Sequence, residues 1–205
     1  MLAAWKIGWL FFAFVLVYGL VSKAYSHPWV RLKKYPVVGW LTIGVFQGFF
    51  TFLMCYAGLN NFGWEPLLQA KVLIPAALST LMLLGSYPMT QVYQHEEDLK
   101  RGDRTISTRL GIRGTFLFVQ LVFTVAAGLY AWYFIAYFST GIAVRYLLCL
   151  APVVVFFMAW FAHVWRNSQK ANYANTMWLN FISAVCLNTF FVWLWLDTSH
   201  VGNVF

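Results

Sequence analysis

The chain has 205 residues, of which 61% are hydrophobic and 10% are charged, and its formal net charge at pH 7 is +8. A soluble domain averages about 25% charged residues, so this composition excludes a water-soluble fold and is typical of a membrane protein. Because no basic stripe lies on a soluble surface, the positive charge indicates contact with lipid headgroups, and we expect no nucleic-acid partner.

Six segments are long and apolar enough to cross a bilayer, which takes roughly 20 residues of α-helix. In chain order they cover about residues 4–21, 36–59, 72–93, 114–138, 142–164 and 174–196. Residues 35–64 contain no charged side chain, and neither do residues 114–144. The sequence therefore predicts an all-α, polytopic membrane protein with about six transmembrane helices, in a single domain over residues 1–205.

The Lys and Arg residues are divided unevenly between the two sides of such a bundle. Eleven lie in the connections after the first, third and fifth segments, and three, Lys6, Lys71 and Arg145, lie on the other side. Because Lys and Arg accumulate in cytoplasmic loops, those three connections are predicted to be cytoplasmic, in the inner membrane if the cell is bacterial. Both ends of this chain would then lie on the opposite side. We therefore expect the chain to be incomplete at its N-terminus, with an odd number of helices before Met1.

Residues 93–111, YQHEEDLKRGDRTISTRLG, hold eight of the chain's twenty charged side chains. We expect the third helix to run through this stretch and to stop at Gly102, because glycine accepts the positive φ of a helix end. Asp103 or Thr105 would then cap a short helix that Gly111 ends.

On such a continuous helix, Gln94 and Asp98 would share a face, and so would Glu97 and Arg101. Carboxylate and amide oxygens at the membrane surface are suitable ligands for Mg²⁺, which often bridges to substrate phosphates. The alternative is a solvated loop whose acids pair with its own bases.

Residues 98–111 read D-x-x-x-G-x-x-T-x-x-x-R-L-G. This pattern resembles the second aspartate-rich motif of the UbiA-type intramembrane prenyltransferase family. The first connection, YSHPWVRLKKYP at residues 25–36, is similar to that family's basic, Tyr-bearing loop before its fifth helix. The six segments then correspond in order to the family's helices four to nine.

The resemblance implies nine helices around a lateral cavity, in which two aspartate-rich motifs bind Mg²⁺ and an isoprenyl diphosphate. The prenyl group passes to a hydrophobic, usually aromatic acceptor, as in the biosynthesis of quinones or related lipids. The second motif often begins with an aspartate that this chain replaces by Gln94, so Glu97 would supply the missing charge. The first motif has no counterpart here, which agrees with the expected N-terminal helices.

By the same resemblance, the metal ligands would be Asp98, Glu97 and Gln94. The residues expected to act in catalysis are Asp98, Lys33 and Arg101. The residues expected to bind substrate are Tyr25, Arg31, Lys34, Arg104 and Gln47. A polar side chain at membrane depth, such as Gln47, indicates either a cavity or an interhelical hydrogen bond.

Further residues near the charged loops are candidates of a weaker kind. Tyr25, Tyr87 and Tyr93 carry aromatic faces that stabilise cations, although an interfacial belt also explains the last two. His27 and His95 lie near the expected site, but neither has a partner at metal-ligand spacing. Two other functions remain: a non-catalytic relative of the family that binds a lipid diphosphate, and a small transporter. The scarcity of ionisable residues within the spans argues against transport.

Overall fold

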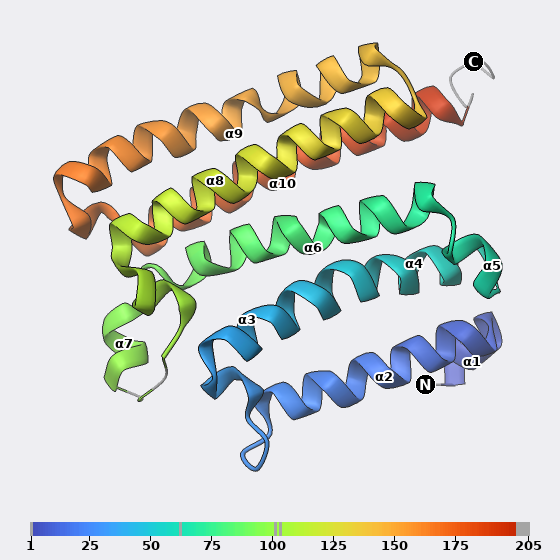
Figure 1. Cartoon of the computed structure of the whole chain (residues 1–205), viewed down its shortest axis with the longest axis horizontal. Coiled ribbons are helices and arrows are strands. Elements are labelled where there is room, and N and C mark those ends of the chain that lie inside the picture. The colour runs from blue at the N-terminus through green and yellow to red at the C-terminus, as the bar shows by residue number, and fades with distance from the viewer. Residues whose placement is uncertain (1, 62, 101, 103, 200–205) are drawn as a thin grey trace. The chain divides into compact units, whose positions relative to one another are not determined.

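The computed structural model describes residues 2–61, 63–100, 102 and 104–199, except for the side chains of Leu2 and Ala3. Its α-helices are α1 (Leu2–Ile7), α2 (Trp9–Ser26), α3 (Pro36–Ile43), α4 (Thr51–Asn60), α5 (Trp64–Leu67), α6 (Ala70–Gln91), α7 (His95–Lys100), α8 (Ile106–Tyr137), α9 (Thr140–Arg166) and α10 (Tyr173–Thr198) (Figure 1). Two short 3₁₀ helices, η1 (Leu32–Lys34) and η3 (Ser168–Lys170), lie in connections, and a π-helix, η2 (Gly44–Phe50), joins α3 to α4.

Among the described residues, six helical stretches are long and apolar enough to span a membrane. They are Trp9–Ser26, Pro36–Asn60, Ala70–Gln91, Ile106–Tyr137, Thr140–Arg166 and Tyr173–Thr198. The predicted all-α fold with six spans is confirmed, and the chain is an integral membrane protein. It divides into two compact units, Met1–Ala126 and Ala127–Phe205. The single domain expected from the sequence stays a prediction.

Two boundaries differ from the sequence prediction. The first span begins at Trp9 and ends at Ser26, because the extended backbone of Gly8 (φ 169°, ψ 150°) separates it from α1. The expected continuation of the third helix to Gly102 is wrong, because α6 ends at Gln91 and a turn leads into α7.

The break after α6 places Gln94 at the start of α7 and not within the third membrane-spanning helix. Its backbone N–H donates to the Gln91 carbonyl (2.9 Å), and its own carbonyl accepts from the Asp98 N–H (2.9 Å), so Gln94 lies at the start of α7. The expected spacing of Gln94 and Asp98 by one helical turn is kept by the second of these bonds, but the helix that carries them is α7 and not a continuation of α6. We attribute the break to tertiary contacts of α7, which override the local helical tendency. Gly102 has the positive φ (70°) that was expected of it.

Proline and tryptophan join the second span to α6. Pro88 has no N–H to donate to the Leu84 carbonyl, which leaves a helical carbonyl without its usual partner. The indole Nε1 of Trp40, on α3, donates to that oxygen at 2.8 Å. An interhelical bond therefore replaces the one that the proline removes.

The π-helix packs closely against α6. A Cβ on Gly48 would lie 2.5 Å from the Thr80 Cα, so only glycine allows this approach of the two backbones. The Thr80 hydroxyl accepts from the Phe49 N–H (2.9 Å), and the Thr51 hydroxyl donates to the Phe46 carbonyl (2.7 Å). These side chains stabilise backbone groups of the widened turn, which is rare in proteins and frequent at functional sites.

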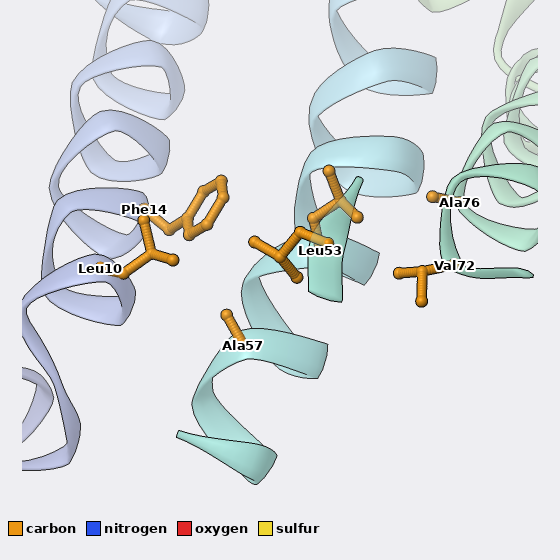
Figure 2. Close-up of a cluster of buried hydrophobic side chains, with 7 residues drawn as sticks. Leu10, Phe14, Leu53, Ala57, Val72 and Ala76 are labelled. Atoms are coloured by element: carbon orange, nitrogen blue, oxygen red, sulfur yellow. The ribbon is translucent and has the colours of Figure 1, made fainter. Parts of the chain in front are cut away.

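A buried apolar cluster holds the end of the first unit at which α2 and α6 begin (Figure 2). Its members are Leu10, Phe14, Leu53, Ala57, Leu67, Val72 and Ala76. Between helices in lipid, such contacts act through close packing, because lipid tails are as apolar as the side chains. The opposite end of this unit carries the polar connections described below.

The second unit contains the C-terminal part of α8 with α9 and α10. Three buried rings meet at its centre: the Phe134 centroid lies 5.1 Å from those of Tyr146 and Phe190, which are 5.2 Å apart. The Arg145 guanidinium carbon lies 4.5 Å from the centroid of the Trp193 ring. Aromatic and cation–π contacts therefore join all three helices within this unit.

Candidate active site at the charged end of the first unit

The ends of α2 and α6 meet through two tyrosines. The hydroxyl oxygens of Tyr25 and Tyr87 are 2.6 Å apart. Because α2 and α6 end close to these residues, the basic loop after α2 and the acidic α7 emerge at the same end of this unit (Figure 1). The two charged segments that the sequence singled out are thus placed on one side of the bundle.

The basic loop has an unusual backbone conformation at Arg31. This half-buried residue has φ 41° and ψ 59°, a left-handed conformation that costs a residue other than glycine about 1–3 kcal/mol. Its N–H donates to the His27 carbonyl at 2.7 Å. Lys33 and Lys34 follow in η1 and are exposed. Strain of this kind tends to occur at functional sites, and this short loop carries three bases, Arg31, Lys33 and Lys34.

The acidic helix α7 is short, and its first turn holds three carboxylates. Asp98 is half-buried and Glu97 is exposed. The Gln94 amide nitrogen donates to the Tyr93 hydroxyl at 2.8 Å. Of the predicted bases after α7, Arg104 is exposed and Arg101 lies outside the described residues.

Gln91 ends α6 one turn before this acidic helix, and its side chain is only 9% exposed. Its Oε1 is buried, and no group in the described part of the chain donates a hydrogen bond to it. Leaving such an acceptor unsatisfied costs about 1–3 kcal/mol. A donor or cation from a bound molecule would satisfy it.

A chain of three side chains attaches α7 to α8. The Nε2 of His95 lies 2.7 Å from the Ser107 hydroxyl, which lies 3.1 Å from that of Thr115. Ser107 and Thr115 are fully buried. Burial lowers the pKa of His95 by disfavouring its charged form. The neutral imidazole therefore holds α7 against α8 through a hydrogen bond without a net charge.

The start of α8 follows the sequence prediction for Thr105, whereas Asp103, the other predicted cap, lies outside the described residues. Thr105 caps α8, because the hydroxyl of Thr105 accepts from the Thr108 N–H (3.2 Å) and the Thr108 hydroxyl accepts from the Thr105 N–H (2.9 Å). Gly111 interrupts the helix with φ 67° and ψ 172°. The Thr115 hydroxyl donates to the Gly111 carbonyl at 2.8 Å across this kink. The short helix from Ile106 to the kink is thereby fixed in direction.

A cleft of about 120 Å³ opens between α2 and the second span. It is lined by Tyr18, Val21, Ser22, Tyr25, Thr42, Ile43, Phe46 and Gln47. Two residues predicted to bind substrate, Tyr25 and Gln47, therefore lie in one cleft. Gln47 belongs to the π-helix and lines this cleft. From the sequence, a cavity and an interhelical hydrogen bond were both possible for its side chain.

Sequence reasoning missed several polar contacts of this site. Nothing in the local pattern pairs Tyr25 with Tyr87, or His95 with Ser107 and Thr115, because these contacts form across separate helices. The one available signal was the occurrence of polar residues near the ends of apolar spans.

A comparison with models of protein families shows to which family the chain belongs. The model of the UbiA prenyltransferase family matches residues 1–195. The chain belongs to the UbiA prenyltransferase family. None of the curated proteins and none of the solved structures compared with the chain matches it. Members of the UbiA family are typically prenyltransferases that depend on Mg²⁺, and their substrates are prenyl diphosphates.

Oxygen atoms of α7 and of the end of α6 are suitable ligands for one part of a UbiA magnesium site. Within the described residues, no group of three or more His, Cys, Asp or Glu side chains could hold a metal by itself. Mg²⁺ commonly uses one or two carboxylates and completes its ligands with water and substrate phosphates. Glu97 and Asp98 supply two carboxylates. The buried Gln91 Oε1 is a further hard oxygen, and no group among the described residues donates a hydrogen bond to it. The residues therefore fit a site that a bound diphosphate completes.

Proposed function

We propose that the chain takes part in the Mg²⁺-dependent transfer of an isoprenyl group from a prenyl diphosphate to an aromatic or other hydrophobic acceptor. The observation that carries this proposal is the position of α7. Two of its three carboxylates, Glu97 and Asp98, follow the end of α6 that the Tyr25–Tyr87 bond joins to α2 and its basic loop. Family membership supplies the reaction class.

In the proposed reaction, the bond between the allylic carbon and the diphosphate oxygen breaks, and its electron pair leaves with the diphosphate. A bond forms between that carbon and the acceptor, which releases a proton to water. Mg²⁺ held by Asp98, Glu97 and Gln94 would offset the negative charge that develops on the diphosphate. Asp98 is the ligand on which the proposal depends most, because it alone matches the family motif without substitution.

The bases have a separate role. Lys33 and Lys34 are exposed in η1, and Arg31 precedes them in its strained conformation. We assign these three residues to the phosphate oxygens, since charge-assisted hydrogen bonds to phosphate are strong. Arg104 would act on the same group, as would Arg101, which lies outside the described residues. Lys33 and Arg101 would stabilise the leaving diphosphate as the reaction proceeds.

The cleft beside α2 suits the organic part of a substrate. Tyr25 offers an aromatic face, which stabilises an allylic cation by about 0.5–2 kcal/mol. Gln47 and the hydroxyls of Ser22 and Thr42 offer hydrogen bonds to polar substituents of the acceptor. Substrate would thus be oriented between the aromatic and polar sides of one cleft.

We further propose that the loops with most of the bases face the cytoplasm and that both ends of this chain lie on the opposite side. Single cysteines in a background without Cys55, Cys149 and Cys186 test this orientation. Gln169→Cys and Gln69→Cys place a thiol at exposed positions of the two sides. A reagent that cannot cross membranes should label only Gln69→Cys in intact cells. Labelling of only Gln169→Cys would reverse the orientation.

The test of the function uses the full chain in lipid nanodiscs with a non-hydrolysable prenyl diphosphate analogue. Asp98→Asn should lower Mg²⁺-dependent binding at least tenfold, because the amide brings no charge to the metal. Glu96→Gln removes an exposed carboxylate on the same helix and should change binding less than twofold. Equal binding by Asp98→Asn and the wild type would favour a loop whose charges pair only with one another.

The same nanodisc preparation distinguishes an enzyme that transfers the prenyl group from a protein that only binds the prenyl diphosphate. A non-catalytic member of the family would bind the analogue with Mg²⁺ but would release no diphosphate from a natural prenyl diphosphate and an aromatic acceptor. That alternative rests on the absence of a counterpart to the family's first aspartate-rich motif within this sequence. Release of diphosphate that Asp98→Asn abolishes would exclude it.

A further inference from the structure

A second cleft, of about 340 Å³, lies in the second unit beside the connection between α9 and α10. It is lined by Phe156, Ala159, Trp160, His163, Lys170 and Asn175. α9 ends at Arg166 and α10 begins at Tyr173, so the connection lies where two membrane-spanning helices leave the apolar layer. We therefore expect the end of this cleft at Lys170 to lie at the depth of the lipid headgroups and its end at Phe156 to lie in the apolar layer.

The wall of the cleft is held in place by hydrogen bonds. The Trp160 indole Nε1 donates to the Lys170 carbonyl at 2.8 Å, and the Asn175 amide nitrogen donates to the same oxygen at 3.1 Å. Trp160 is only 4% exposed, and its ring lies 6.3 Å from that of Phe156. Hydrogen bonds from Trp160 in α9 and Asn175 in α10 thus fix the backbone of η3 beside the aromatic side of the cleft.

The charge around this cleft is of one sign. Arg166 and Lys170 are exposed, and His163 lines the cleft while its Nδ1 lies 2.7 Å from the Ala159 carbonyl. The sequence contains no Asp or Glu from residue 104 to residue 196. Asp197 is at the other end of α10, about 36 Å along the helix axis from Tyr173 at 1.5 Å per residue. Within its described residues, this unit therefore places no carboxylate near these bases along the chain.

We propose that this cleft binds an anionic glycerophospholipid, with its phosphate at Lys170 and Arg166 and the upper part of an acyl chain against Trp160 and Phe156. A basic rim above an apolar wall at headgroup depth matches that amphiphile, whereas a free phosphate would leave the aromatic wall unused. A prenyl diphosphate fits less well, because the cleft has no carboxylate to share a metal with it. None of the residues that line this cleft is among those assigned to prenyl transfer.

The test measures lipid retention by the purified full chain with native mass spectrometry, after exchange into equal amounts of phosphatidylglycerol and phosphatidylcholine. The wild type should retain phosphatidylglycerol at least fivefold over phosphatidylcholine. Arg166→Gln/Lys170→Gln should abolish this preference. Lys6→Gln removes an exposed base of the first unit and should leave it unchanged.

A second variant distinguishes a cleft from a diffuse surface charge. Ala159→Leu keeps both bases but fills the cleft, so it should reduce retention about as much as the double charge variant. Retention by Ala159→Leu equal to the wild type would overturn the proposal, and so would equal retention of the two lipids by the wild type. Full displacement of phosphatidylglycerol by millimolar inorganic phosphate, or by the prenyl diphosphate analogue without Mg²⁺, would also overturn it.

Discussion

The hydroxyl of Tyr25, near the end of α2, is hydrogen-bonded to that of Tyr87 in α6, at 2.6 Å between their oxygens. The two residues are 62 positions apart. Because Tyr25 also lines the cleft between α2 and the second span, the same bond sets the position of a cleft wall and joins the two helices from which the charged segments emerge.

Removing either hydroxyl should weaken this end of the bundle while leaving both rings packed. Tyr25→Phe and Tyr87→Phe should each lower the free energy of unfolding by about 0.5–1.5 kcal/mol, which is the net value of one hydrogen bond. Unfolding by dodecyl sulfate in mixed micelles, followed by circular dichroism, measures it. The double variant should lose no more than one of the singles, since both remove the same bond. Additive losses would show that the two hydroxyls act separately.

Gly48 should be intolerant of any side chain, because its added Cβ would lie 2.5 Å from the Thr80 Cα and 2.6 Å from the Thr80 nitrogen. Both atoms belong to the backbone, so one helix must move. Gly48→Ala should lower the free energy of unfolding by about 1–3 kcal/mol. Gly19→Ala is the matched control, because nothing lies within 4 Å of its added Cβ, and it should stabilise α2 by up to about 1 kcal/mol. Similar stability of the two variants would show that the π-helix does not need this close approach.

His95 and Ser107 should together keep α7 ordered. His95→Ala and Ser107→Ala each remove the bond between α7 and α8, so amide hydrogen exchange over residues 95–100 should accelerate about threefold to tenfold in Mg²⁺-free buffer. His163→Ala, which removes an exposed ring in the second unit, should leave this exchange unchanged. Wild-type exchange rates in both variants would mean that other contacts hold α7.

The regular parts of this fold were predictable because they depend on composition alone. Each of the six spans follows from a long, mostly apolar run, and bilayer thickness sets its length. Gly102 and Gly111 were also predictable, since a glycine beside a charged turn marks a position with positive φ.

The contacts that form the site were not predictable, because they join residues far apart in sequence. α6 ends at Gln91, and α7 starts a new helix whose His95 is bonded to Ser107. The π-helix likewise depends on a tertiary fit, that of Gly48 against Thr80, and no local period in the sequence indicates it. What the sequence supplied was the chemistry of Asp98 and its neighbours; their positions come from packing between helices.

Gly111 has the backbone conformation on which the direction of the first turn of α8 depends. Its φ of 67° and ψ of 172° lie in a region that is essentially confined to glycine, so Gly111→Ala must either accept about 1–3 kcal/mol of strain or straighten the helix. Straightening would move Ser107 away from His95 and release α7. We therefore expect Gly111→Ala to lower the free energy of unfolding, to accelerate amide exchange over residues 95–110, and to weaken Mg²⁺-dependent binding of the diphosphate analogue. Gly114→Ala is the control, because its added Cβ would make an ordinary 3.4 Å contact with the Leu110 Cβ. If Gly111→Ala matches Gly114→Ala in all three measurements, the kink does not position the acidic helix.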